Sequence, residues 1–201
     1  MSKKIVLIGA TGTIGQGVAA HLQARHEIIT VGARSGQYQA DIADLRQVEA
    51  LFDRIGKVDA VVVTAGALHF GPLAEITPAQ FRIGLDSKLM GQVNVAQVAQ
   101  RFLNDGGSIT LTSGVLADAP IRYGAVASMT NAAVEGYARG AAIELPRGLR
   151  INVVSPALLD ESVEAYGEYF RGWETVPARR VALAYERSIE GAQTGQVYKV
   201  V

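Results

Sequence analysis

Three glycines spaced three residues apart near the N-terminus form the part of the sequence best suited to bind a ligand. Gly9, Gly12 and Gly15 follow the apolar run Ile5 to Ile8, and helical spacing of apolar residues begins directly behind them. In such a strand–turn–helix, the first glycine allows a tight turn, the second lets backbone approach a pyrophosphate, and the third packs helix against strand. The unpaired N–H groups at the helix N-terminus then bind the phosphates. The sequence therefore predicts a dinucleotide site.

The composition is that of one folded domain. Of the 201 residues, 49% are apolar and 19% charged, which suits a single domain with a substantial core. Lysine plus arginine and aspartate plus glutamate number 19 each, so we expect no nucleic-acid or membrane partner. No cysteine is present, and the three histidines lack a metal-like spacing, so we expect no metal site. The apolar run that breaks at Gly9 is too short for a signal peptide, so we expect a cytoplasmic protein.

Apolar runs alternate with helical spacing along the chain. The run 58–63 is almost purely apolar, which is typical of a strand buried on both faces of a parallel sheet. Repeated strand–helix units imply right-handed crossovers, so the predicted fold is α/β: a doubly wound, Rossmann-like parallel sheet in one domain, residues 1–201. The expected strands are 5–8, 28–31, 38–42, 58–63, 108–112, 150–154 and 196–201, and the expected helices are 14–25, 45–55, 78–103 and 123–144.

Several segments, in the same order, resemble motifs of the short-chain dehydrogenase/reductase family. The strongest is Ala132 to Tyr137, which is followed by the similar stretch Ala142 to Pro156. Thr64-Ala65-Gly66 is similar to the family's Asn-Ala-Gly, and Gly107 to Ser113 resembles the strand that delivers its catalytic serine. The resemblance covers nearly the whole chain. It implies an oxidoreductase that binds a nicotinamide dinucleotide and acts on a small carbonyl or alcohol substrate.

The same resemblance implies which residues bind the dinucleotide. The turn from Gly9 to Gly15 is similar to the family's cofactor loop, and Asp41-Ile42 resembles its adenine-pocket pair. The end of the second expected strand carries Arg34-Ser35 in place of the acid that usually holds the ribose of NAD. Because arginine and serine can bind a 2′-phosphate, we predict NADP over NAD. The expected cofactor-binding residues are Gly9, Thr11, Gly12, Thr13, Ile14, Gly15, Arg34, Ser35, Asp41, Ile42, Ala65, Gly66 and Pro156.

The catalytic positions depart from the family pattern of Ser, Tyr-x-x-x-Lys and Asn. Alignment through Ala132 to Tyr137 places the tyrosine position at Ala127 and the lysine position at Asn131. The serine position falls at about Gly114, and Lys88 stands where the family's asparagine is expected. All four positions are therefore altered or displaced.

Two hypotheses follow from these substitutions. In the first, the chain is an enzyme in which Lys88 restores the missing charge, while Tyr123 or Ser113 donates the proton or holds the substrate. In the second, the chain is a catalytically inactive NADP(H)-binding redox sensor or a scaffold. The first is favoured because the cofactor carries the difficult chemistry and the protein mainly positions it.

The stretch after Pro156 is expected to form a lid over the substrate. Tyr166, Tyr169, Phe170 and Trp173 have the spacing of one apolar stripe on a short helix. The stripe either packs on the core or faces an apolar or aromatic carbonyl compound. The expected long helices 78–103 and 123–144 resemble those through which family members form dimers and tetramers, so we expect a homodimer or homotetramer.

Overall fold

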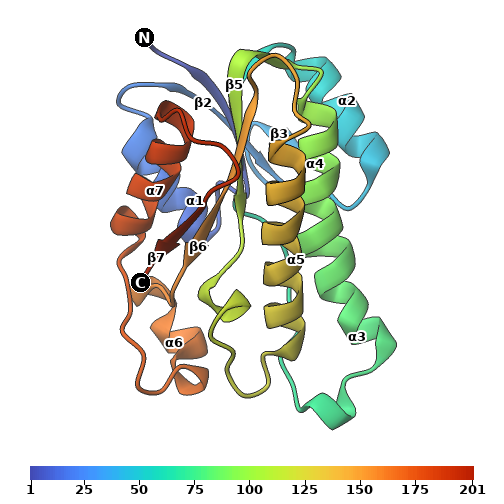
Figure 1. Cartoon of the computed structure of the whole chain (residues 1–201), viewed down its shortest axis with the longest axis vertical. Helices are drawn as coiled ribbons and strands as arrows, with labels where there is room; N and C mark the ends of the chain where they lie inside the picture. The colour runs from blue at the N-terminus through green and yellow to red at the C-terminus, as the bar shows by residue number, and fades with distance from the viewer.

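Seven strands of the computed structural model, which describes residues 1–201, form one parallel sheet in the order β3-β2-β1-β4-β5-β6-β7 (Figure 1). The chain runs outward from β1 to β3 and then returns to add β4 beside β1. Ligands of open α/β sheets bind where the strand order reverses in this way. The strands are β1 Lys4–Ile8, β2 Glu27–Gly32, β3 Tyr38–Gln39, β4 Val58–Val63, β5 Leu103–Thr112, β6 Arg150–Pro156 and β7 Val197–Val200.

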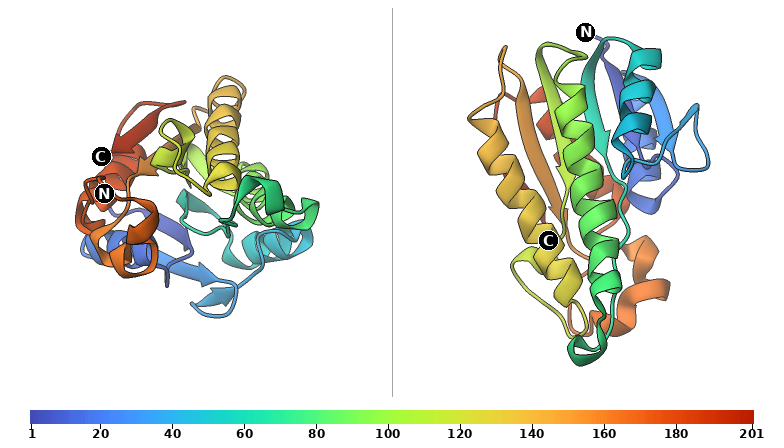
Figure 2. Two further views of the ribbon diagram at one scale, coloured as in Figure 1. Left: turned by 90° about the horizontal axis from the view of Figure 1, so that it is seen from below. Right: turned by 90° about the vertical axis from the view of Figure 1, so that its right-hand side faces the viewer.

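Helices cover both faces of the sheet, as Figures 1 and 2 show. On one face lie α1 (Thr13–Leu22) and α7 (Ala178–Glu190), and on the other lie α2 (Leu45–Ile55), α4 (Gly91–Ala99) and α5 (Ala125–Ala142). The predicted doubly wound α/β fold is confirmed. The shorter helical segments are η1 Leu73–Glu75, α3 Pro78–Arg82, η2 Ile83–Met90, η3 Val115–Ala117, η4 Asp160–Ser162, α6 Val163–Tyr166 and η5 Gly167–Tyr169.

The sequence of β4 does not alternate between apolar and polar residues, because both faces of this strand are buried. Val61 and Val63 pack into the core beneath α2, α4 and α5, whereas Ala60 and Val62 pack into the second core beneath α1 and α7. All four side chains have no exposed surface. Because both faces of a doubly wound sheet are covered, the run Ala60 to Val63 is apolar, and the one polar residue of β4, Asp59, lies near its amino end, where it is only half-buried.

Three of the expected elements have different bounds in the structure. The expected helix 78–103 consists of α3, the π-helical segment η2 and α4, and β5 already begins at Leu103. The expected strand 108–112 therefore begins earlier, at Leu103, beside the register irregularity between Val58 and Ala60. The strand expected at 38–42 covers only Tyr38–Gln39. Helix α7 was not predicted, although its apolar residues have helical spacing.

The carboxyl ends of the strands all lie at one end of the molecule, where Figure 1 shows α3 and α6. The view from below in Figure 2 looks onto this end. No helix of the chain is both long enough and apolar enough to span a membrane.

Candidate functional site

The glycine turn after β1 is packed so closely that only glycine fits at two of its positions. Gly9 has φ +86°, and a β-carbon added there would lie 2.8 Å from the backbone nitrogen of Ala65. A β-carbon on Gly15 would lie 2.1 Å from the carbonyl oxygen of Gly9. Thr64 links this turn to the end of β4, because its hydroxyl shares one proton between the carbonyls of Ile8 (3.0 Å) and Gly9 (3.1 Å).

Gly12 leaves open space at the N-terminus of α1. A β-carbon on Gly12 would meet only the Gly9 carbonyl oxygen, at 3.5 Å. Helix α1 has no side-chain cap and no acidic residue in its first turn. The backbone N–H groups of that turn are therefore available to a phosphate, which the macrodipole of the helix attracts. The turn, which also contains Thr11, Thr13 and Ile14, fits the pyrophosphate of a dinucleotide.

Arg34 and Ser35 lie just beyond the end of β2, beside the glycine turn. The Ser35 hydroxyl donates to the hydroxyl of Thr11 at 3.3 Å, which links the two loops. Arg34 is exposed, and no ion pair engages its guanidinium. Both residues therefore lie near the glycine turn, and the Arg34 guanidinium has no carboxylate partner.

Asp41 and Ile42 differ in their exposure. Asp41 is exposed, and its carboxylate accepts from the backbone N–H of Ala43 at 3.0 Å. The Ile42 side chain is only 7% exposed and packs in the core against Gly91. The Ile42 carbonyl accepts from Asn94 at 3.0 Å. The structure thus leaves Asp41 as the member of the pair whose side chain can contact an adenine.

A cavity of about 480 Å³ lies at the carboxyl ends of the central strands. Six of the residues predicted for the site line it, and they come from both the cofactor and the catalytic sets. Helix α1 supplies Ile14, so the cavity begins at the glycine turn. The six residues are Ile14, Ala65, Gly66, Lys88, Ser113 and Pro156.

Lys88 is the charged side chain of this cavity. It is 9% exposed, and the only hydrogen bond of its side chain is from Nζ to the carbonyl of Ser113, at 3.2 Å. Burial lowers the pKa of Lys88 to about 8, because a low-dielectric environment disfavours the ammonium form. No carboxylate pairs with it. Gly66 allows its backbone to pass close by, since a β-carbon there would lie 2.8 Å from Lys88 Cα.

A buried glutamine holds the segment that carries Lys88. Lys88 lies in the π-helical segment η2, and such segments occur frequently at functional sites. The Gln92 amide donates to the carbonyls of Lys88 (3.0 Å) and Thr112 (2.9 Å) and accepts from the Thr112 N–H (2.8 Å). Gln92 therefore fixes Lys88 against the end of β5.

Ser113 lies at the cavity wall, but its hydroxyl is already engaged. Its Oγ donates to the carboxylate of the buried Glu135 at 2.8 Å, and its N–H donates to the Val154 carbonyl at 3.0 Å. The hydroxyl can therefore accept from a substrate but has no proton left to donate. The Ser113 carbonyl, in contrast, positions the Lys88 ammonium.

The structure does not bring Tyr123 to the cavity. The prediction placed it on the long helix, but α5 begins at Ala125 and Tyr123 lies in the preceding turn with φ +68°. Its carbonyl accepts from the Gly71 N–H at 3.0 Å, and its ring lies 4.9 Å from the Arg122 guanidinium. Tyr123 is therefore not among the residues that line the cavity.

The lid is not one helix with an apolar stripe, as was expected. Helix α6 ends at Tyr166, and Gly172 adopts φ +82°, which interrupts any continuous helix from 166 to 173. Tyr166 and Phe170 nevertheless line the cavity. Tyr169 instead stacks on Phe70, with ring centroids 5.9 Å apart.

Three buried polar residues at the site were not predicted: Gln92, Asn131 as a cavity residue, and Glu135. All three are at most 5% exposed. The sequence does carry a signal for them, because each polar residue stands on a helix face that is otherwise apolar. Buried polar groups are costly unless they are bonded, so such a residue indicates a specific contact. Asn131 lines the cavity, and its Oδ1 has no partner.

The chain is similar to known proteins along its whole length. The family model described as enoyl-(acyl carrier protein) reductase matches residues 10–190. The protein lin1944 from Listeria innocua is 45% identical, with a TM-score of 0.98 and 100% of both chains covered. A small-chain dehydrogenase solved in complex with NADPH is 29% identical, with a TM-score of 0.90, over 100% of this chain and 97% of that one.

Curated relatives point the same way. The hydroxynaphthalene reductase-like protein Arp2 of Metarhizium brunneum is 30% identical over 78% of this chain and 68% of its own. The chain spans between 51% and 80% of the length of the first curated relatives that it matches. The matched family model, these reductases and the parallel sheet with its glycine turn agree, so the chain belongs to the short-chain dehydrogenase/reductase family of oxidoreductases.

Proposed function

We propose that the protein is an NADP(H)-dependent oxidoreductase that interconverts a small carbonyl compound and its alcohol. The observation that carries the proposal is a buried lysine in a cavity that begins at the glycine turn. Ile14, beside the turn, and Lys88 line the same cavity. A cofactor bound at the turn and a substrate held near Lys88 would therefore meet.

The dinucleotide, when bound, supplies a hydride, that is two electrons and a proton, to the carbonyl carbon and is itself oxidised. Lys88 Nζ gives a proton to the carbonyl oxygen as the C=O double bond becomes single. The neutral amine that remains takes a proton from water. Because burial holds the pKa of Lys88 at about 8, the ammonium predominates at neutral pH and is still a better acid than an exposed lysine.

NADP rather than NAD is the cofactor in this proposal. The exposed Arg34 and the Ser35 hydroxyl stand at the end of β2 without a carboxylate beside them. The structural relative bound to NADPH supports the same preference. The aromatic side chains of Tyr166 and Phe170 in the cavity, together with the hydroxynaphthalene reductase-like relative, favour an apolar or aromatic carbonyl substrate. A cytoplasmic location and a homodimer or homotetramer remain parts of the proposal.

Calorimetric titration with NADPH and NADH tests the cofactor assignment. We expect NADPH to bind in the micromolar range and NADH much more weakly. Arg34→Ala should weaken NADPH binding by about ten- to a hundredfold, the value of a charge-assisted hydrogen bond, and leave NADH binding unchanged. The control is Arg101→Ala, which removes the same charge from an exposed residue that pairs with Glu49. Equal affinities for both dinucleotides would contradict the NADP assignment.

An inactive NADP(H) sensor is the second candidate, and one observation favours it. Ala127 and Gly114, the positions of the family's tyrosine and serine, offer no functional group, and Ala127 is fully buried. NADPH consumption across aldehydes, ketones and quinones separates the two candidates. Turnover that is lost in Lys88→Met supports the enzyme. Micromolar NADPH binding without turnover, coupled to a large difference in affinity between NADPH and NADP⁺, supports the sensor.

A further inference from the structure

A side chain at residue 114, two residues beyond β5, would crowd the Asn131 amide. The φ of residue 114, 172°, is extended backbone that any residue can adopt, so the turn does not require glycine. A β-carbon at this position, however, would lie 3.1 Å from Nδ2 of Asn131, which is tighter than ordinary van der Waals contact. The Asn131 amide therefore occupies the space beside Gly114 into which a larger side chain would extend.

Asn131 has an unusual surrounding for a buried amide. It projects from α5 into the cavity and is 3% exposed, and its Oδ1 has no hydrogen-bond partner. An unpartnered buried polar group lowers the stability of the fold, and such groups are normally bonded. An unpaired amide oxygen on a residue that lines a cavity is a candidate for a hydrogen bond from a ligand.

Lys88 and Asn131 approach two successive residues from different helical segments. Lys88 Nζ donates to the Ser113 carbonyl at 3.2 Å, and the Asn131 amide lies beside Gly114. The other polar side chains of this wall are engaged elsewhere. The Thr112 hydroxyl donates to the Val63 carbonyl at 2.5 Å, and the Ser113 hydroxyl donates to Glu135. Lys88 and Asn131 are therefore the two side chains of this wall that can donate a hydrogen bond to a substrate, whereas the Ser113 hydroxyl can only accept one.

We propose that the Asn131 amide is a second catalytic group, which donates a hydrogen bond to the substrate's carbonyl oxygen alongside Lys88. This inference rests on the proposed function. The amide N–H stabilises the negative charge that develops on this oxygen, while Lys88 alone transfers the proton. The amide oxygen accepts from a hydroxyl next to the carbonyl. The substrate class is thus a hydroxy-carbonyl compound, and no atom is exchanged with Asn131.

The paired probes 2-hydroxyacetophenone and acetophenone differ only in that hydroxyl. The chain has four asparagines, so ¹⁵N-asparagine labelling gives few side-chain signals, and Asn131→Leu identifies the one from Asn131. Titration of the NADP⁺-loaded protein, which cannot reduce either ketone, should shift this signal with the hydroxyketone. Calorimetry should show the hydroxyketone binding about three- to tenfold more tightly than acetophenone, as one added hydrogen bond provides.

Two variants test the role of the amide. Asn131→Leu should remove the preference between the two ketones, and Gly114→Ala, which adds a methyl group in the amide's space, should reduce it. Gly136→Ala on α5 is the matched control, because a β-carbon there meets nothing within 4 Å. It should behave like the wild type.

Three results would overturn the inference while NADPH still binds. The first is that the NADP⁺-loaded wild type binds neither ketone, and the second is that Asn131→Leu retains the preference for the hydroxyketone. The third is that the Asn131 signal moves with NADP⁺ alone and not with ketone, which would assign the amide to the cofactor. If the wild type binds no NADPH, the proposed function itself fails, and this inference fails with it.

Discussion

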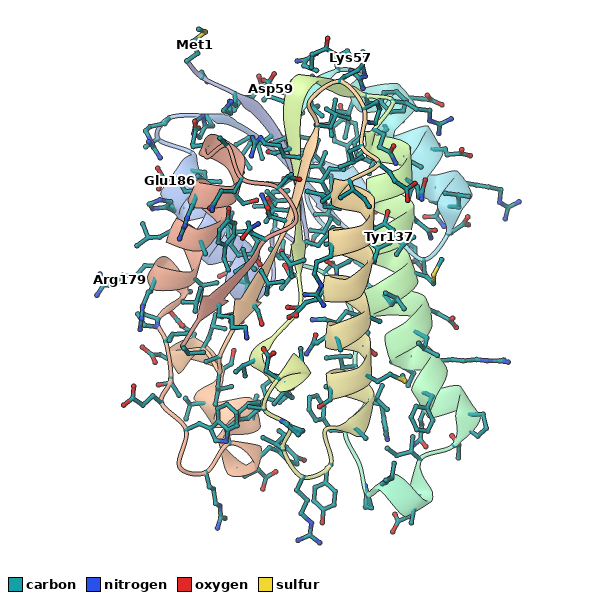
Figure 3. The ribbon with its side chains drawn as sticks, in the orientation of Figure 1. Met1, Lys57, Asp59, Tyr137, Arg179 and Glu186 are labelled. Carbon is teal, nitrogen blue, oxygen red and sulfur yellow. The ribbon has the colours of Figure 1, made fainter.

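The two ends of the sheet use polar side chains in opposite ways. At the amino end, Asp59 accepts from the Lys4 N–H and from the Asn104 amide, both at 2.8 Å. Arg147 donates to the Leu103 carbonyl at 3.0 Å and to Asp105 at 2.7 Å. At the carboxyl end, Lys88 has one carbonyl partner and no counter-charge, and Asn131 Oδ1 has no partner. Figure 3 shows Asp59 at the end opposite α6.

We infer that the polar groups at the amino end stabilise the fold, whereas those at the carboxyl end contact ligands. Partners at the amino end are more exposed and complete their own hydrogen bonds, so they contribute to folding. The lysine and the amide at the carboxyl end are desolvated without full compensation, so they cost folding free energy. Groups kept at such a cost in a cavity are candidates for contacts with ligand. Substitutions at the two ends should therefore have opposite consequences.

Lys88→Met should produce the largest effect. General acid catalysis contributes about 10²- to 10⁴-fold, so turnover of a carbonyl substrate should fall by at least about a hundredfold. The free energy of unfolding should stay the same or rise, because the variant removes a buried charge that has no counter-charge. Steady-state kinetics and urea unfolding measure the two effects. A variant with normal turnover and reduced stability would make Lys88 a structural residue.

Asp59→Ala should show the reverse. Loss of its two hydrogen bonds should lower the free energy of unfolding by about 1–2 kcal/mol, after allowance for its partial exposure, and leave the NADPH dissociation constant unchanged. Burial raises the pKa of Asp59, but the hydrogen bonds from Lys4 and Asn104 outweigh this and lower it overall. A lowered pKa means that the stabilisation is present above the unfolded pKa and is lost as the pH falls through the folded one.

Urea unfolding of the wild type and of Asp59→Ala at several pH values tests this sign. The difference in free energy of unfolding between the two proteins should be largest at pH 7 and should disappear as the pH falls below about 4. A difference that grows at low pH, or a weakened NADPH affinity, would contradict the separation of the two ends.

The turnover of a carbonyl substrate should fall about tenfold per pH unit above the pKa of Lys88. With the pKa of Lys88 lowered to about 8 by burial, the ammonium form is lost above this pH. The kcat/KM for carbonyl reduction should therefore be level below pH 8 and fall about tenfold per unit above it. A profile that stays level to pH 10 would show that another group supplies the proton.

The sequence predicts the sheet and the glycine turn well because local rules determine them. Apolar runs identify buried strands, and Gly9 and Gly15 stand where added β-carbons would clash. Helix α7 was predictable too, since Val181, Tyr185 and Ile189 recur at four-residue spacing.

The arrangement of the cavity could not be predicted from the sequence. That Asn131 is unpaired beside Gly114 depends on how α5 approaches β5, which no local pattern encodes. Tyr123 was placed on the helix because its spacing fits. The positive φ of Tyr123 and the helix start at Ala125 follow from the turn in the chain before α5. Such sites depend on tertiary contacts, so sequence spacing alone identifies candidates without their partners.

The smallest effect is expected between the two ends, on the outer faces of α1 and α7. Glu186 pairs there with His21 and with Arg25, and Figure 3 shows it on the outer side of α7. The hydrogen bond from His21, then that from Arg25, lowers the pKa of Glu186. Because Arg25 is half exposed, solvent screens the pair, and Glu186→Gln should lower the free energy of unfolding by less than about 1 kcal/mol. Thermal unfolding at low and high salt measures it, and the loss should shrink with salt. A loss as large as that of Asp59→Ala would mean that this helix contact contributes as much to stability as the amino end of the sheet.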